Sequence, residues 1–167
     1  MSQPAIQVQS LTACRVAQLV RYAPAFGPAH VGPVAGPMFE EVADLLEAVN
    51  APVVGPPQGV YDMAAPDEPG AVRITVAFPV PPFVTEVAGL EVATLPGIER
   101  AATIVFHGAP EGTYHGAPDG IGGAWVTFLD RLDAQGYAMT HHTREIYLSP
   151  PGLPEEDWDT LLVAELA

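Results

Sequence analysis

The sequence contains no lysine, and its 6 arginines stand against 20 aspartates and glutamates, which gives a formal net charge of -14. Proteins that bind a phosphate backbone present clustered basic side chains, so we expect no nucleic-acid partner. The absence of lysine also excludes a P-loop and Schiff-base catalysis. The acidic balance favours solubility and gives a modest long-range attraction for cations, which does not by itself indicate a site.

Cysteine is almost absent as well. Cys14 is the only one, so neither an intrachain disulfide nor a thiolate zinc site can form. The five histidines show no metal-ligand spacing, and we expect neither a metal nor a cofactor. No run approaches the ~18 apolar residues of a membrane span, and the first residues lack the features of a signal peptide. We expect a soluble, cytoplasmic monomer or homodimer with no membrane partner.

What the chain does contain is an internal repeat. Leu11 and Leu95, which each close a short strand, are 84 residues apart, and Tyr61 and Tyr147, which lie in later strands, are 86 apart. A nearly constant offset across separate elements indicates a duplication. The predicted strands are Ile6–Leu11, Arg15–Tyr22, Gly59–Met63 and Val72–Pro79 in the first half, and Leu90–Leu95, Arg100–His107, Arg144–Ser149 and Thr160–Leu166 in the second.

Each half also contains one amphipathic helix. The first is predicted at Met38–Asn50, with Pro37 at or near its first turn and an apolar stripe of Phe39, Val42, Leu45, Leu46 and Val49. The second is predicted at about Gly122–Gln135, with Trp125, Phe128, Leu129 and Leu132 in its stripe.

These elements predict an α+β fold in one domain, residues 1–167, with repeats at about 5–80 and 88–167. Each repeat reads strand, strand, helix, strand, strand, and we expect its first two strands to form a hairpin-like pair. The two repeats would build one antiparallel-rich sheet about a pseudo-twofold axis, with both helices on one face. The other face would curve into a ligand cleft between the halves.

The stretch T-R-E-I-Y-L-S at 143–149 supplies the candidate site. Alternation along a strand puts Glu145 and Tyr147 on the face that Ile146 avoids. If Ile146 faces the helices, Glu145 and Tyr147 face the cleft, with Gly59 and Tyr61 as their counterparts in the first repeat. The alternative is that Glu145 is a surface residue paired with Arg100 or Arg73, and that both tyrosines are ordinary core residues.

The order of motifs resembles the GyrI-like family of small-molecule-binding and effector-binding domains. The matching segments are R-V-A-Q-L-V-R-Y-A-P, G-P-P-Q-G-V-Y-D, L-E-V-A-T-L-P-G, R-A-A-T-I-V-F-H-G-A-P, the Trp-bearing helix and T-R-E-I-Y-L. The resemblance implies the duplicated fold and a cleft that binds lipophilic, often aromatic and cationic compounds over an acidic residue. That residue matches Glu145, and Tyr147 matches its neighbour. The chain has no helix-turn-helix segment, so we expect a stand-alone member.

The chain departs from the family pattern in one long Gly/Pro-rich loop before the second helix, which repeats H-G-A-P at 107–110 and 115–118. The Gly/Pro-rich loop of the first half is also long. Such loops serve as lids in some proteins and are tolerated surface insertions in others. Phe26 and Tyr114 in these loops are further candidates for the cleft wall. Trp125 is most simply a core residue, and we also place it among the candidate ligand contacts.

Two functions fit these residues. In the first, a carboxylate in an aromatic cleft binds a lipophilic cation by charge, ring contacts and apolar burial. In the second, some family members look like hydrolases that open a strained cyclopropane. Glu145 would then be the general acid or base, and Tyr147 or Tyr61 would donate a hydrogen bond to the developing charge. The sequence favours binding narrowly and leaves the question of an enzyme open.

Overall fold

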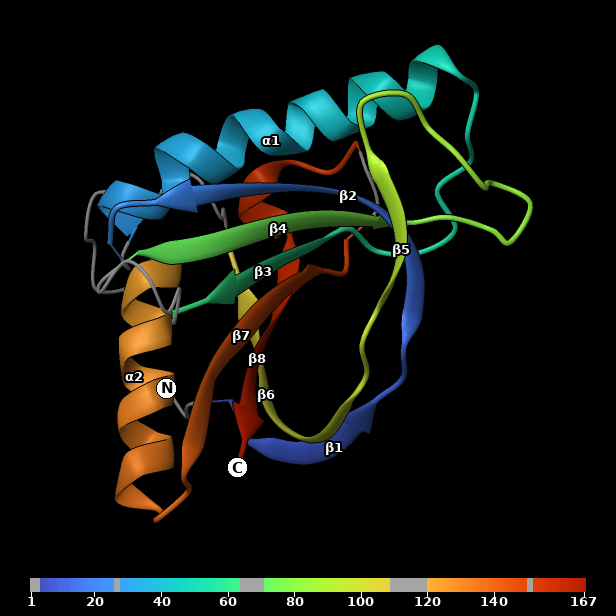
Figure 1. Cartoon of the computed structure of the whole chain (residues 1–167). Coiled ribbons are helices and arrows are strands. Elements are labelled where there is room, and N and C mark those ends of the chain that lie inside the picture. Colours follow the sequence, from blue (N-terminus) through green and yellow to red (C-terminus); the bar gives the residue numbers. More distant parts are fainter. Residues whose placement is uncertain (1–3, 26–27, 64–70, 109–119, 150–151) are drawn as a thin grey trace.

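The computed structural model describes residues 4–25, 28–63, 71–108, 120–149 and 152–167. Figure 1 shows one curled sheet with two helices outside it. The elements, in chain order, are β1 (Gln7–Leu11), β2 (Cys14–Ala23), α1 (Pro28–Ala48), β3 (Gln58–Asp62), β4 (Val72–Pro79), β5 (Glu91–Leu95), β6 (Ile98–His107), α2 (Ile121–Ala134), β7 (Met139–Tyr147), a short 3₁₀ turn (Glu155–Asp157) and β8 (Asp159–Leu166).

The sheet is antiparallel and symmetric in its strand order. Its eight strands run β1-β6-β8-β7-β3-β4-β2-β5 among the described residues. Replacing each strand by its counterpart in the other repeat turns this order into its own reverse, as a pseudo-twofold axis between β7 and β3 requires. The duplicated α+β fold predicted from the offset is therefore confirmed.

One detail of the prediction is wrong, because the first two strands of each repeat do not pair with each other. β1 pairs with β6, and β5 pairs with β2, so the repeats exchange their edge strands. The two short links cross where a Cβ on Gly97 would lie 2.6 Å from the Leu11 carbonyl oxygen. Alternation within a strand fixes its two faces but not its partner, so this exchange left no signal in the sequence.

The first helix is longer than predicted. α1 begins at Pro28, a residue favoured at a first helical position, and contains Pro33 and Pro37 in its interior. Each internal proline removes one backbone donor, and a buried stripe on the core side packs this part of the helix on the sheet; its members are Val31, Ala35, Met38, Val42 and Leu46. Val49 was expected in the stripe but is 49% exposed, since the helix ends at Ala48.

The second helix lies within one residue of its expected bounds, and Trp125, Phe128 and Leu132 are buried as predicted. α1 packs on β2 and β4, and α2 packs on β6 and β8, so both helices cover one face of the sheet (Figure 1). Neither described helix has the length and apolarity that crossing a bilayer requires.

The face without helices lies inside the curl of the sheet. Aliphatic side chains fill it in two clusters, one around Val16, Val60 and Ala77 and the other around Ile146 and Val163. We expected the ligand cleft on this face, and that expectation is wrong. The sheet curls, and the edge strands are exchanged between the repeats, so side chains from different parts of this face contact one another and form an apolar core of their own.

Candidate functional site

Glu145 and Tyr147 lie on the helix-covered face, the reverse of the predicted assignment. Trp125 of α2 donates a hydrogen bond to Glu145, and Phe39 of α1 contacts the Tyr147 ring edge-on at 5.2 Å between centroids. Ile146 faces the inside of the curl. The alternation was read correctly, but it does not say which side of a sheet the helices cover, and here both sides are packed.

Three neutral donors surround the Glu145 carboxylate, whose residue is only 7% exposed. Its Oε2 accepts the Trp125 indole N–H at 2.7 Å, and its Oε1 accepts the Tyr147 hydroxyl at 2.7 Å. Burial raises the pKa of Glu145, while hydrogen bonds from Trp125, Tyr147 and Tyr61 act in the opposite direction. The desolvation of the charged form outweighs these three bonds, so the site favours a proton or another cation.

Gly59 makes this arrangement possible from the neighbouring strand. It pairs with Glu145 across β3 and β7, so the pseudo-twofold axis passes between these two equivalent positions. A Cβ on residue 59 would lie 2.5 Å from the Tyr61 hydroxyl oxygen. The hydroxyl therefore occupies the space above the glycine, from which it reaches Glu145.

Aromatic rings and one orphaned hydroxyl complete the surroundings. Phe39 also contacts Phe78 at 6.2 Å between centroids. Thr160 pairs with Tyr147 and so shares its face, and its fully buried Oγ1 has no hydrogen-bond partner among the described residues. Sequence reasoning missed Phe39 and Thr160 as site residues. The sequence did contain a signal for Phe39, because this residue belongs to the apolar stripe predicted for the first helix. The sequence contained no such signal for Thr160.

The structure brings together Glu145, Tyr147, Tyr61, Gly59 and Trp125, five of the seven predicted site residues. The other two, Phe26 and Tyr114, lie outside the described residues.

The arginine partners considered for Glu145 lie elsewhere: Arg100 donates to the Ala167 carbonyl oxygen, and Arg73 lies in β4 next to Asp62 of β3. In the described part of the chain no arginine forms an ion pair with Glu145, and no group of three or more residues could hold a metal ion.

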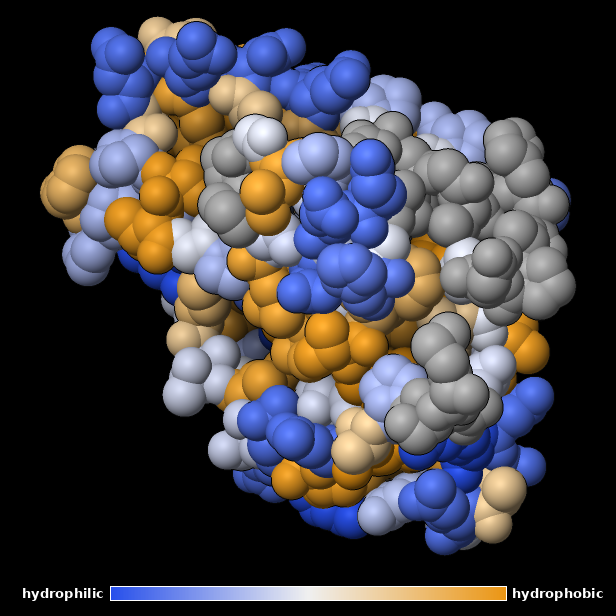
Figure 2. All heavy atoms as spheres, turned by 180° about the vertical axis from the view of Figure 1, so that it is seen from behind, coloured by the Kyte–Doolittle hydropathy of each residue, from blue (hydrophilic) through white to orange (hydrophobic). Residues whose placement is uncertain are grey.

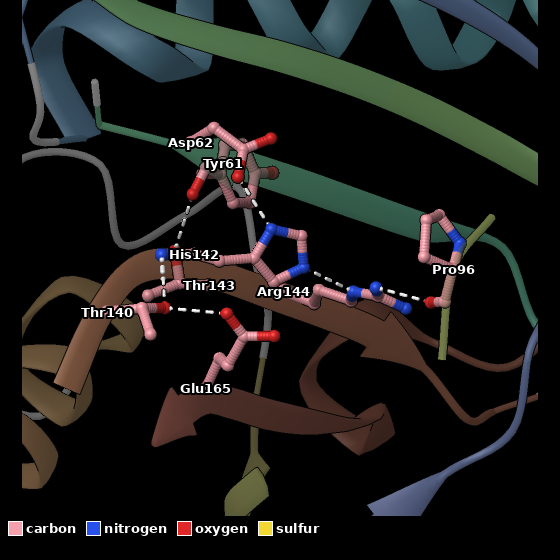
Figure 3. Close-up of polar contacts among 8 residues, drawn as sticks. All are labelled: Tyr61, Asp62, Pro96, Thr140, His142, Thr143, Arg144 and Glu165. Carbon is pink, nitrogen blue, oxygen red and sulfur yellow. Dashed lines mark hydrogen bonds and ion pairs between the residues drawn. The ribbon is translucent and has the colours of Figure 1, made fainter. Parts of the chain in front are cut away.

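Inside the curl, on the opposite face of the same strand pair, a polar chain fixes β7. Figure 3 shows the His142 ring between Asp62 and Arg144. His142 Nδ1 lies 2.5 Å from Asp62 Oδ1, and its Nε2 accepts the Arg144 Nε–H at 2.7 Å, so Nδ1 is the ring nitrogen that donates to Asp62. The 2%-exposed Arg144 also donates to the Pro96 carbonyl oxygen in the β5–β6 link. This chain joins both repeats beneath the Glu145 site.

No protein-family model and no curated protein sequence matches the chain. Several solved structures share its fold. The C-terminal domain of EcmrR is 14% identical to this chain in a superposition that covers 99% of each, with a TM-score of 0.65. SAV2435 bound to tetraphenylphosphonium is 14% identical over 98% of this chain and 94% of that one, with a TM-score of 0.66. A hydrolase encoded by lin2189 from Listeria innocua is 11% identical over 99% and 93%, with a TM-score of 0.56.

The class of protein is thus defined at the level of fold. The chain shares its duplicated α+β fold with these structures, and this is the fold that the GyrI-like resemblance implied. At identities this low, the likeness says nothing by itself about ligands.

Proposed function

We propose that this chain is a GyrI-like small-molecule-binding domain that takes a lipophilic, aromatic cation at Glu145. One observation carries the proposal: a buried carboxylate is surrounded by neutral donors and rings, with no arginine as counter-ion in the described part of the chain. A buried charge without an opposite charge is costly, so a cation that also buries apolar surface gains from both effects. Tyr147, Tyr61 and Trp125 would supply the ring faces.

Binding at Glu145 requires side chains to move. One cavity lined by described residues lies at the C-terminal end of α1 and does not include Glu145. Phe39 and Tyr147 are half-buried rings in edge contact, and the Tyr147 hydroxyl bonds the carboxylate, so displacement of this pair would open a path to Glu145. The fold neighbour SAV2435 is known bound to tetraphenylphosphonium, and that ion is a suitable probe here.

The test is calorimetric titration with tetraphenylphosphonium and with tetraphenylborate, an anion of nearly the same shape. We expect the cation to bind and the anion to give no heat of binding. Glu145→Gln keeps the size of the side chain and should weaken the cation at least ten-fold, as expected for loss of a charged partner. Equal binding of both ions, or unchanged affinity in Glu145→Gln, would exclude the proposal.

The affinity should also depend on pH in a defined direction. Because burial raises the pKa of Glu145, a proton occupies the carboxylate over a wider range than for an ordinary glutamate. A cation must displace that proton, so its affinity should rise with pH through this range and then level off. In Glu145→Gln the rise should be absent.

A hydrolase is the second candidate, favoured by the same raised pKa, which suits a general acid. Glu145 would protonate the carbon that leaves as a strained ring bond breaks, and water would add to the other carbon of that bond and return a proton to Glu145. Tyr147 would donate a hydrogen bond to the developing charge. Single-turnover assays with a cyclopropane-containing electrophile test this. Turnover by Glu145→Gln at the wild-type rate would eliminate Glu145 as the catalyst.

A further inference from the structure

A pocket lies at the C-terminal end of α1, away from Glu145. It has a volume of about 410 Å³, within the ~300–1,000 Å³ range of small-ligand sites. We call it the α1-end pocket: its walls are the last turns of α1, then Ala51 and Val53 of the following segment, and Phe78 of β4. Its floor is apolar, with the buried Leu46 and Phe78 side chains.

The walls of the α1-end pocket are held in place separately. Asn50 adopts a left-handed conformation, with φ of 52°, and the Leu46 carbonyl oxygen accepts the Ala51 N–H at 3.0 Å, which closes the helix. Further along, the Val54 N–H donates to the Pro79 carbonyl oxygen at 2.9 Å, which fixes the segment to the end of β4. The pocket is therefore preformed, and a ligand would lose little free energy in ordering it.

Apolar surface continues around the rim. Val49, Val53 and Val54 are all exposed, at 49%, 44% and 60%. Figure 2 shows hydrophobic surface beneath the C-terminal end of α1, at the upper left of that view, next to the hydrophilic outer side of the helix. A ligand with an apolar body would cover surface that the fold itself leaves in water.

The charges around the α1-end pocket select a cation. Among the residues that the structure describes, Glu47 is the only ionisable one that lines it. The C-terminal end of a helix carries partial negative charge, and the last turn of α1 contains no basic residue to offset it. Both features have the same sign, and no lysine exists in the chain to neutralise them.

From this geometry and charge we infer that the α1-end pocket binds a small organic cation with an apolar body, such as an aromatic quaternary ammonium. The apolar part would lie on Leu46 and Phe78, with the cationic group near Glu47 at the rim. This site is distinct from the one proposed at Glu145. It does not depend on that proposal, although Phe78 contacts Phe39, which in turn contacts Tyr147.

The test is a methyl-detected NMR titration of the full chain with benzyltrimethylammonium, compared with neopentylbenzene, its uncharged carbon isostere. We expect saturable shifts of the Ala43, Ala51 and Val53 methyl groups with the cation, and weaker binding of the isostere. The same shifts should persist in Glu145→Gln, so that failure at one site is distinguishable from failure at the other.

Two variants make the inference falsifiable. Glu47→Gln should weaken the cation about two- to five-fold, as an exposed charge contact implies, while the matched control Asp44→Asn, an exposed acid of α1 that does not line the pocket, should not. Ala43→Leu at an exposed helical position should fold and occlude the pocket, and should abolish the shifts of Ala51 and Val53. Shifts that never saturate, equal effects of Glu47→Gln and Asp44→Asn, or equal binding of the isostere would each overturn the inference.

Discussion

Replacing Gly59 by alanine should disturb the Glu145 site without touching Glu145 itself. The added methyl carbon would lie 2.5 Å from the Tyr61 hydroxyl oxygen and 3.0 Å from its Cζ. Contacts this short cannot persist, and the neighbouring strand backbone is held by pairing on both sides of β3, so the Tyr61 ring must move. Its hydrogen bond to Glu145 would then be lost.

The size of the effect follows from two opposing terms. A hydrogen bond to a charged group contributes about 1.5–3 kcal/mol to the free energy of unfolding. Alanine in place of glycine raises that free energy by about 0.4–1 kcal/mol, because it lowers the conformational entropy of the unfolded chain. We therefore expect Gly59→Ala to lower the free energy of unfolding by about 1–2 kcal/mol. The pKa of Glu145 should rise further, because one of the bonds that stabilise its charged form is removed.

Urea unfolding of a double-mutant cycle measures the contact directly. In the Tyr61→Phe background the hydroxyl is absent, so Gly59→Ala should cost less there than in the wild type, by about 1–2 kcal/mol. If the two substitutions are additive within about 0.5 kcal/mol, Tyr61 does not lie over Gly59 as described and the reasoning is refuted.

Three further outcomes follow from other contacts. The free energy of unfolding of the wild type, measured relative to Glu145→Gln, should fall as pH rises above the ordinary glutamate pKa. Glu145 keeps its proton in the folded chain after the unfolded chain has lost it, and this contribution to stability disappears as pH rises through the raised pKa. Trp125→Phe should cost about 1.5–3 kcal/mol in urea unfolding, because the indole N–H bond to Glu145 disappears. Gly97→Ala should lower the free energy of unfolding by at least about 2 kcal/mol, because its Cβ would lie 2.6 Å from the Leu11 carbonyl oxygen. Gly36→Ala in α1 should raise it by about 0.5–1 kcal/mol, because the added methyl group meets open space. A change of the opposite sign in either variant would contradict the corresponding prediction.

Much of the fold could be read from local patterns, because each repeat has its own strands and stripe. The bounds of β4 were predicted to the residue, and those of α2 to within one. The start of α1 was placed at Met38 because Pro37 was read as a first-turn residue. Buried packing along the α1 stripe outweighed the loss of the donors at Pro33 and Pro37, and composition alone does not report that balance.

Which face holds the carboxylate could not be predicted from the strand alone. Ile146 and Glu145 alternate whichever face the helices cover, and both faces of this sheet are buried. The duplication did contain the better signal. An offset of 86 residues makes Gly59 and Glu145 equivalent, and equivalent residues on central antiparallel strands meet at the axis. The offset alone therefore implies that Gly59 and Glu145 pair across β3 and β7.

The site owes its chemistry to the point where the symmetry of the repeats is broken. Two equivalent positions touch at the axis, so a symmetric pair of glutamates there would place two buried carboxylates side by side, at high cost. Glycine at position 59 removes the second charge and also the second side chain. The space it leaves is taken by the Tyr61 hydroxyl, while the counterpart hydroxyl of Tyr147 binds the same carboxylate from the other side. Duplication thus provides two matched tyrosines, and one asymmetric pair turns them into the donors of a single acid.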